Sequence, residues 1–169
     1  MVIKMIDEEC RMKSKKLAQE YAIRAREMMD SGKFKELILG VDPDDPWSEK
    51  SLNSAEEGFL SEYYANPDAD YTHYILFVGE GFVRKYKAAW GNSVDAFGER
   101  AAPGSEKLIG IYYPQLRNSP FKPLTYLLKH TVDFNEEGYT EWWSTILIGE
   151  AEFLAWRERF VAKKKKIKK

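Results

Sequence analysis

The chain of 169 residues lacks several features that mark particular classes of protein. Its one cysteine, Cys10, excludes an intramolecular disulfide and suits a reducing compartment, so we expect a cytoplasmic protein. It contains no apolar run of about eighteen residues, and its N-terminus is too acidic for a signal peptide. With two histidines, His73 and His130, and no HExxH, CxxC, GxSxG or P-loop motif, it gives no reason to predict a metal or a cofactor.

The net charge of −1 hides an uneven distribution of charge. Six lysines stand in the last seven residues, and removing them leaves 20 basic against 27 acidic side chains. The body therefore carries a net charge near −7 and ends in a basic tail over 163–169. We interpret the tail as a solvated helix end. The alternative is a weak contact with nucleic acid or an anionic surface through Lys163, Lys164, Lys165 and Lys166.

Composition and hydrophobic periodicity predict one globular domain over 1–162, because 44% of the residues are hydrophobic and no linker is visible. Apolar residues at helical spacing predict helices over 8–31, 54–65, 71–90, 121–132 and 140–165. A short strand is expected near 89–95, and a clear β-branched and aromatic strand at 108–113. The fold class is therefore α+β, a mostly helical single domain with a small antiparallel sheet or hairpin.

Several details of these elements are also predicted. Asn53 or Ser54 is expected to cap the second helix, with Glu56 in its first turn and Tyr64 on its buried face. Pro123 is expected in the first turn of the fourth helix and His130 at its end, followed by an acidic loop over 133–138. The segment 34–39 is of uncertain type, and 142–148 is either helix or strand, with helix favoured by length.

The sequence Gly79-Glu80-Gly81 lies inside the central predicted helix. It is a poor match to a dinucleotide-binding motif, because Arg84 stands where the third glycine belongs. We interpret the glycines as small residues that let another element approach closely. Glu80 and Arg84 are four residues apart, which predicts a structural ion pair or, alternatively, the centre of a catalytic site.

Two acidic stretches are the candidate partner-binding surface. Trp47 accompanies the first stretch and either folds back over the core or marks the interface, because tryptophan is common at binding hot spots. The candidate residues are Asp42, Asp44, Asp45, Trp47, Asp133, Glu136 and Glu137.

The segment YILFVGEGFVRKYKAAWGN at 74–92, the strand LIGIYYP at 108–114 and a Pro-led helix at 120–130 form a recognisable order. Together with Ser51-Leu52 at the start of the upstream helix, it resembles uncharacterised small bacterial proteins of the immunity-protein type, encoded beside toxins. In them a helix with Gly-Glu and Val-Arg is followed by Gly and Trp and then by short strands. The resemblance covers about residues 50–130 and implies no catalytic residues.

These observations favour a non-enzymatic protein that binds another protein, as an immunity-type inhibitor of a basic toxin does. An acidic inhibitor associates quickly with a basic partner through electrostatic steering. Two alternatives remain at this point. One is a small hydrolase or transferase with its site around Glu80 and Arg84, and the other is a nucleic-acid accessory protein that uses the lysine tail.

Overall fold

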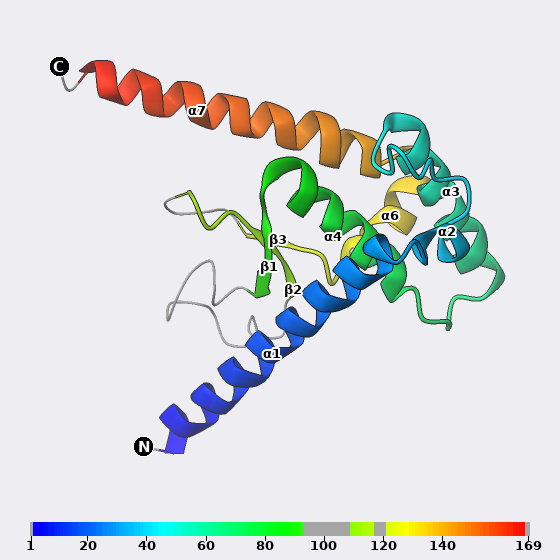
Figure 1. The fold of residues 1–169 in the computed structure, drawn as a ribbon. Coiled ribbons are helices and arrows are strands. Elements are labelled where there is room, and N and C mark those ends of the chain that lie inside the picture. Colours follow the sequence, from blue (N-terminus) through cyan, green and yellow to red (C-terminus); the bar gives the residue numbers. More distant parts are fainter. Residues whose placement is uncertain (1, 93–108, 117–120, 168–169) are drawn as a thin grey trace.

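The computed structural model describes residues 2–92, 109–116 and 121–167 (Figure 1). The described chain is mostly helical, with a small antiparallel sheet, which confirms the predicted α+β fold class. The elements in order are α1 (Val2–Asp30), α2 (Phe34–Leu37), α3 (Glu49–Ala65), α4 (Thr72–Tyr86), β1 (Ala89–Asn92), β2 (Ile109–Tyr112), β3 (Lys122–Pro123), α6 (Leu127–Glu136), the π-helical segment η3 (Ser144–Gly149) and α7 (Glu150–Ile167). Residues 93–95 of the first predicted strand and residue 108 of the second lie outside the described residues.

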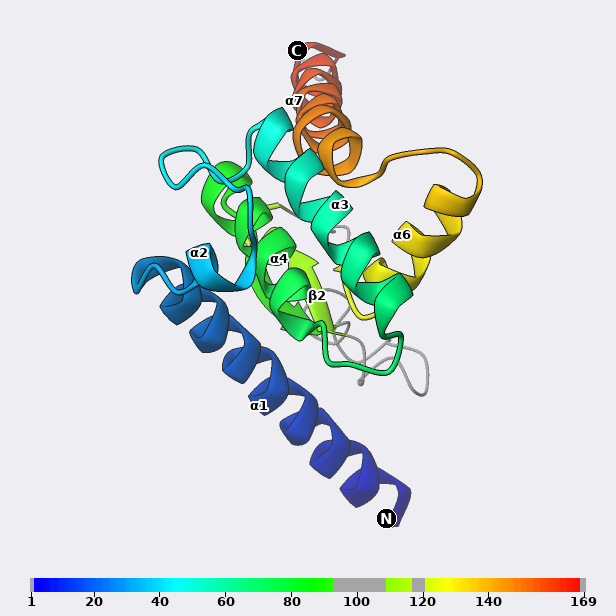
Figure 2. The same ribbon diagram turned by 90° about the vertical axis from the view of Figure 1, so that its right-hand side faces the viewer.

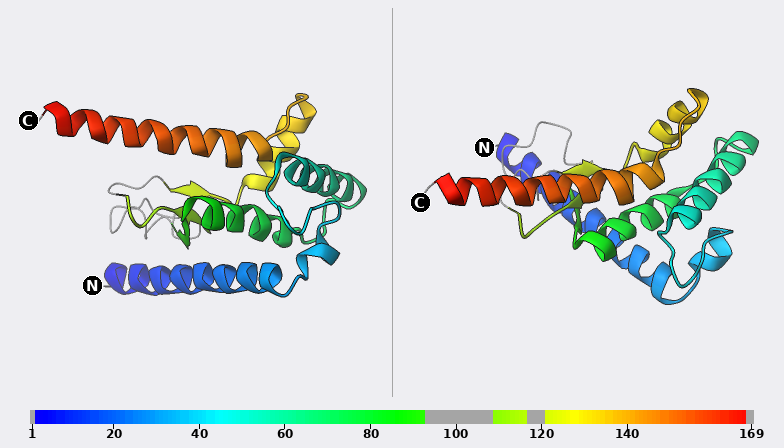
Figure 3. Two further views of the ribbon diagram at one scale, coloured as in Figure 1. Left: turned by 45° about the horizontal axis from the view of Figure 1, so that its top comes forward. Right: turned by 90° about the horizontal axis from the view of Figure 1, so that it is seen from above.

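The arrangement places α4 and the sheet between two long helices. The left view of Figure 3 shows α1 on one side of α4 and the sheet, and α7 on the other. Both chain ends lie at the same side of the molecule in this view and in Figure 1. Helix α1 packs on α4 and β1, whereas α7 touches the body mainly next to its own beginning, at η3.

The sheet has the order β1-β2-β3, and both strand pairs are antiparallel. Trp90 in β1 lies opposite Ile111 in β2, which lies opposite Lys122 in β3. The structure therefore confirms strands at 89–92 and 109–112 and adds a third, two-residue strand. Pro123 is tolerated there because β3 is an edge strand.

The two glycines of α4 allow two tryptophans to lie against the helix. A Cβ at Gly79 would come within 2.2 Å of the Trp90 ring, and a Cβ at Gly81 within 2.8 Å of the Trp47 ring. This confirms the prediction that these glycines permit close approach.

Helix α4 ends at Lys87, whose left-handed backbone (φ 61°) turns the chain into β1. The helix predicted for 71–90 is therefore wrong at Ala89 and Trp90, which are in the strand.

The core is rich in aromatic residues. Phe59, Tyr74 and Trp142 bring α3, α4 and the start of the last helical segment together, with ring centroids 5.4–6.0 Å apart. Phe77, Phe82 and Ile111 are fully buried around this cluster. Of the two adjacent tryptophans, Trp142 is the one at the centre of the core, and Trp143 is only partly buried.

Helix α3, which corresponds to the helix predicted over 54–65, begins earlier than predicted. Ser48 is its N-cap, and the Ser48 hydroxyl accepts a hydrogen bond from the Ser51 N–H at 3.1 Å. Ser48 follows directly after Pro46 and Trp47, so helix α3 begins immediately after the first acidic stretch. As a result Glu56 is not in the first turn, where the prediction placed it, but is buried in the middle of α3.

The region 121–138 also differs from the prediction. Residues 122 and 123 pair with β2, so Pro123 is not in a helix and α6 begins only at Leu127. His130 therefore lies in the first turn of α6 and not at its end. The acidic residues Asp133 and Glu136 belong to the last turns of α6, and the predicted loop is reduced to the residues after Glu136.

The last segment is helical, so the alternative of a strand at 142–148 is wrong. Its helix contains a π-helical turn, η3, before α7 begins at Glu150. Helix α7 continues through residues 162 and 163 without a break, so the predicted boundary between domain and tail falls inside a helix. Within the described residues, no helix combines the length and the apolar character that crossing a membrane requires.

Candidate functional sites

Glu80 and Arg84 form the predicted ion pair, which belongs to a larger network. Arg84 Nε donates to Glu80 Oε2 at 2.8 Å, and Arg84 Nη2 donates to Asp30 of α1 at 2.8 Å. Trp90 Nε1 donates to the second oxygen of Glu80 at 3.2 Å. The Glu80 carboxylate is 4% exposed and is covered by groups that bind it. The network ties α1, α4 and β1 together, as a structural pair does.

The enzymatic alternative requires an open cleft at Glu80. Neither Glu80 nor Arg84 lines any of three hollows in the described part of the chain, although Asp30, which pairs with Arg84, lines one of them. Among the described residues, no three His, Cys, Asp or Glu side chains gather as metal ligands would. His73 stands partly exposed in the first turn of α4, and burial lowers the pKa of its imidazole.

Trp47 folds back over the core, which is the first of its two predicted alternatives. Its indole is 6% exposed and stacks on Phe77, and its Nε1 donates to the Phe77 carbonyl at 2.9 Å. The ring lies in the space left by Gly81. Trp47 is therefore a core residue that fastens the first acidic stretch, and it does not stand on the surface as an anchor for a partner.

The two acidic stretches are both exposed, but they lie apart. Asp42, Asp44 and Asp45 are held at the start of α3, where the Ser51 hydroxyl accepts from the Asp42 N–H and donates to the Asp45 carbonyl. The end of α6 lies near the other end of α3, where Asn135 donates to the Tyr64 hydroxyl at 3.3 Å. Ser51 and Tyr64 are about 20 Å apart along the helix axis. Figure 2 shows the first stretch and α6 on opposite sides of α3, so they do not form one patch.

The end of α6 combines the second acidic stretch with exposed aromatic rings. Phe134, Tyr139 and Tyr64 are 40%, 63% and 51% exposed. The chain folds tightly here, since the Tyr139 N–H donates to the Phe134 carbonyl at 2.8 Å. We call this the α6 surface, and it comprises Tyr64, Asp133, Phe134, Glu136, Glu137 and Tyr139. The prediction that Tyr64 is buried was wrong. Sequence analysis missed the three rings because it assigned Tyr64 to a core face and Phe134 to a loop, and placed Tyr139 in no element.

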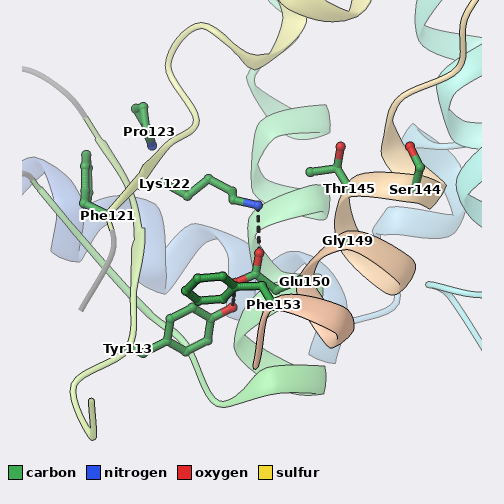
Figure 4. Close-up of a pocket in the computed structure, with 9 residues that line it drawn as sticks. All are labelled: Tyr113, Phe121, Lys122, Pro123, Ser144, Thr145, Gly149, Glu150 and Phe153. Atoms are coloured by element: carbon green, nitrogen blue, oxygen red, sulfur yellow. Dashed lines mark hydrogen bonds and ion pairs between the residues drawn. The ribbon is translucent and has the colours of Figure 1, made fainter. Parts of the chain in front are cut away.

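A second buried carboxylate, Glu150, lies at the base of a pocket of about 600 Å³ (Figure 4). The Tyr113 hydroxyl donates to one of its oxygens, and Lys122 Nζ donates to the other at 2.8 Å. The ammonium also stands 4.8 Å from the centre of the Phe82 ring. Burial, together with the bond to Glu150, raises the pKa of the Tyr113 hydroxyl, which therefore remains a hydrogen-bond donor at neutral pH.

The π-helical segment η3 shapes one wall of this pocket. It carries Ser144 and Thr145, and it ends at Gly149, directly before Glu150. A Cβ at Gly149 would lie 2.8 Å from the Ser144 carbonyl oxygen, so the wide turn requires glycine here. Single π-helical turns are rare and often occur at functional sites. Sequence analysis missed this site, because Tyr113, Lys122 and Glu150 are spread over three elements and form no motif.

Glu56 is a third buried carboxylate, and it caps the last helical segment from a different helix. Its oxygens accept from the N–H groups of Glu141 and Trp142 at 3.0–3.2 Å. Burial raises the pKa of Glu56, and the two backbone hydrogen bonds oppose this effect. Burial also raises the pKa of the neighbouring Glu141. Glu56 thus satisfies backbone donors that the segment itself leaves unpaired.

The lysine-rich tail adds little to the description of a site. The backbone of residues 163–167 belongs to α7, which agrees with the interpretation of a helix end. The side chains of Lys163–Lys166 lie outside the described residues. Any contact of the tail with an anionic partner therefore stays a prediction.

No protein-family model, curated protein or solved structure matches the chain.

Proposed function

We propose that this protein is a non-enzymatic, cytoplasmic, immunity-type inhibitor that binds a basic toxin through the α6 surface. The observation that carries the proposal is the gathering of three exposed rings and three exposed carboxylates at the end of α6. Aromatic side chains supply most of the binding energy in many interfaces, and surrounding charges select the partner and speed association.

The α6 surface supports this role better than the first acidic stretch does. Asp42, Asp44 and Asp45 have no exposed ring beside them that the structure identifies, since Trp47 is buried. Asp42 also has a local task, because its Oδ1 accepts from the Asp44 N–H at 2.9 Å and shapes the turn. The charges of this stretch contribute to the acidic field of the body, but the contact itself is assigned to α6.

The test is the kinetics of binding to a candidate toxin encoded beside this protein, measured at two salt concentrations. The variant Asp133→Asn/Glu136→Gln/Glu137→Gln removes three charges from the α6 surface. The matched control Asp42→Asn/Asp44→Asn/Asp45→Asn removes three charges from the other stretch and keeps its turn, because Asn also accepts such a bond.

We expect the α6 variant to associate about tenfold more slowly at low salt and the control variant to change much less. Phe134→Ala/Tyr139→Ala should act on dissociation and weaken binding by about 2 kcal/mol or more. An equal effect of the two charge variants, together with a silent aromatic variant, would show that the α6 surface is not the interface.

A further inference from the structure

The pocket above Glu150 is lined by Lys122, whose ammonium has more N–H donors than the hydrogen bond to Glu150 requires. The ammonium of Lys122 carries three N–H donors. In the described part of the chain, one side-chain acceptor, Glu150 Oε2, receives a bond from it. The Lys122 side chain is 34% exposed, while that of Glu150 is 6% exposed. The buried carboxylate therefore holds the ammonium in place, and the Lys122 side chain lines the pocket.

The charges of the cluster cancel. Glu150 contributes one negative charge, Lys122 one positive charge, and Tyr113 stays neutral because its pKa is raised by burial. An anionic ligand would leave one negative charge uncompensated next to a buried carboxylate, which is costly. An uncharged acceptor, such as an amide or ketone carbonyl, can take a charge-assisted hydrogen bond from Lys122 without this cost.

The walls of the pocket favour an apolar body on the ligand. Figure 4 shows Phe121 and Pro123 on one side of Lys122, and Thr145 and Ser144 on the other. Phe153 lies beside Tyr113 and Glu150 at the base. A pocket of about 600 Å³ with aromatic residues in its walls and a mostly apolar surface has the size and composition of a small-molecule site. A second hollow of about 290 Å³ shares Lys122, Pro123 and Thr145 with it.

We propose that this pocket is a binding site for a small uncharged molecule that has an aromatic or similarly apolar body and a carbonyl acceptor. The carbonyl oxygen accepts a hydrogen bond from Lys122 Nζ, and the apolar body lies between Phe121 and η3. Glu150 and Tyr113 position the ammonium and do not touch the ligand. The site is separate from the α6 surface and does not depend on the function proposed for it.

The test is a titration of the full chain by ligand-observed NMR with three probes of similar size. N-benzylacetamide has the carbonyl and no charge, 3-phenylpropanoate has a carboxylate, and propylbenzene has no acceptor. N-benzylacetamide is expected to bind with a Kd on the order of 1 mM, as its size allows. The other two probes are expected to bind at least about fivefold more weakly.

Two variants locate the bound probe. Lys122→Met/Glu150→Gln removes both charges together, so no unpaired carboxylate is left, and the amide oxygen of the introduced glutamine can still accept from Tyr113. This double variant should weaken N-benzylacetamide about tenfold or more and leave propylbenzene unchanged. Thr145→Trp should fill the pocket and abolish binding of all three probes. The control Lys129→Met makes the same lysine change at an exposed position of α6 and should change nothing.

The proposal is overturned by any of three results. The first is no binding of N-benzylacetamide by the wild-type protein. The second is tighter binding of 3-phenylpropanoate, which would make this an anion site. The third is binding that both pocket variants leave intact while circular dichroism shows them folded, which would place the probe elsewhere. If a variant fails to fold, the other variant and the probe series still decide the question.

Discussion

Glu80 and Glu150 have nearly the same chemistry in two different surroundings. Each carboxylate is about 5% exposed, and each binds one cation and one aromatic donor: Arg84 and Trp90 in the first case, Lys122 and Tyr113 in the second. Around Glu80 the Trp90 ring fills the space above Gly79, and Arg84 continues to Asp30. Around Glu150 the space above the cluster is a pocket. A buried ion pair alone therefore does not indicate a functional site; the decisive feature is what occupies the space beside it.

The largest effect is expected at Phe82, which lies between the two regions. It is fully buried on α4, two residues after Glu80, and its ring faces the Lys122 ammonium. Phe82→Ala should lower the free energy of unfolding by about 3–5 kcal/mol, because it leaves a cavity in a closely packed core. Urea unfolding measures this change, and an unchanged midpoint would mean that α4 is not buried at this point.

The close packing of the Trp90 ring on α4, next to Glu80, can be tested by adding a methyl group at Gly79. Gly79→Ala should cost about 1–3 kcal/mol, because the new Cβ would lie 2.2 Å from Trp90. Gly58→Ala on α3 is the matched control, since its nearest neighbour, the Tyr74 hydroxyl, is 3.5 Å away. The control should be neutral or stabilising by up to about 1 kcal/mol, because alanine is the better helix former. Equal losses in the two variants would remove the argument for close approach at Gly79.

The smallest effect is a dependence on pH that extends the comparison to the third buried carboxylate, Glu56. Since burial raises its pKa, the folded state holds the Glu56 proton to higher pH than the unfolded chain does. The contribution of Glu56 to stability should therefore fall as pH rises from 4.5, the usual pKa of a glutamate, through the raised pKa of the folded state. Above that pKa the contribution should become constant.

Glu56→Gln removes this titration while keeping a hydrogen-bond acceptor. The stability of the wild type relative to the variant should thus decline as pH rises above about 4.5, until the carboxyl group of Glu56 is ionised in the folded state as well. The difference between the two unfolding curves cancels the groups that do not interact with Glu56, whereas Glu141, whose charge also raises the pKa of Glu56, remains part of the difference. A wild type that gains stability relative to the variant as pH rises would show that the backbone hydrogen bonds outweigh burial.

Part of this architecture was accessible from the sequence. Strong helical periodicity placed α1, α4 and the last helix, and the β-branched run placed β2. The two glycines of the Gly-Glu-Gly segment correctly indicated a close approach, and the spacing of Glu80 and Arg84 an ion pair, because small residues and a four-residue spacing are visible in the sequence of one helix. The boundaries failed where tertiary contacts decide them: Ser48, and neither Asn53 nor Ser54, caps α3, and pairing with β2 takes Pro123 out of the helix.

The candidate sites were less accessible. The pocket depends on Tyr113, Lys122 and Glu150, which meet only through the packing of β2, β3 and α7. Trp47 was placed on the surface as one alternative because its neighbours are acidic, yet its indole finds a partner in the Phe77 carbonyl, 30 residues away in the chain. Neither contact leaves a signal of fixed spacing, so no local pattern predicts it.

The most direct test of the central comparison is the unfolding free energy of Glu80→Ala measured beside that of Glu150→Ala. Both changes remove a buried carboxylate from a helix and leave an aromatic donor and a cation behind. Water from the pocket can replace the carboxylate at Glu150, whereas Trp90 lines none of the three hollows of the described residues, so at Glu80 its N–H loses its acceptor. We predict that Glu80→Ala loses about 2 kcal/mol more than Glu150→Ala. An equal loss, or a larger loss at Glu150, would contradict the distinction between a sealed structural cluster and an open site.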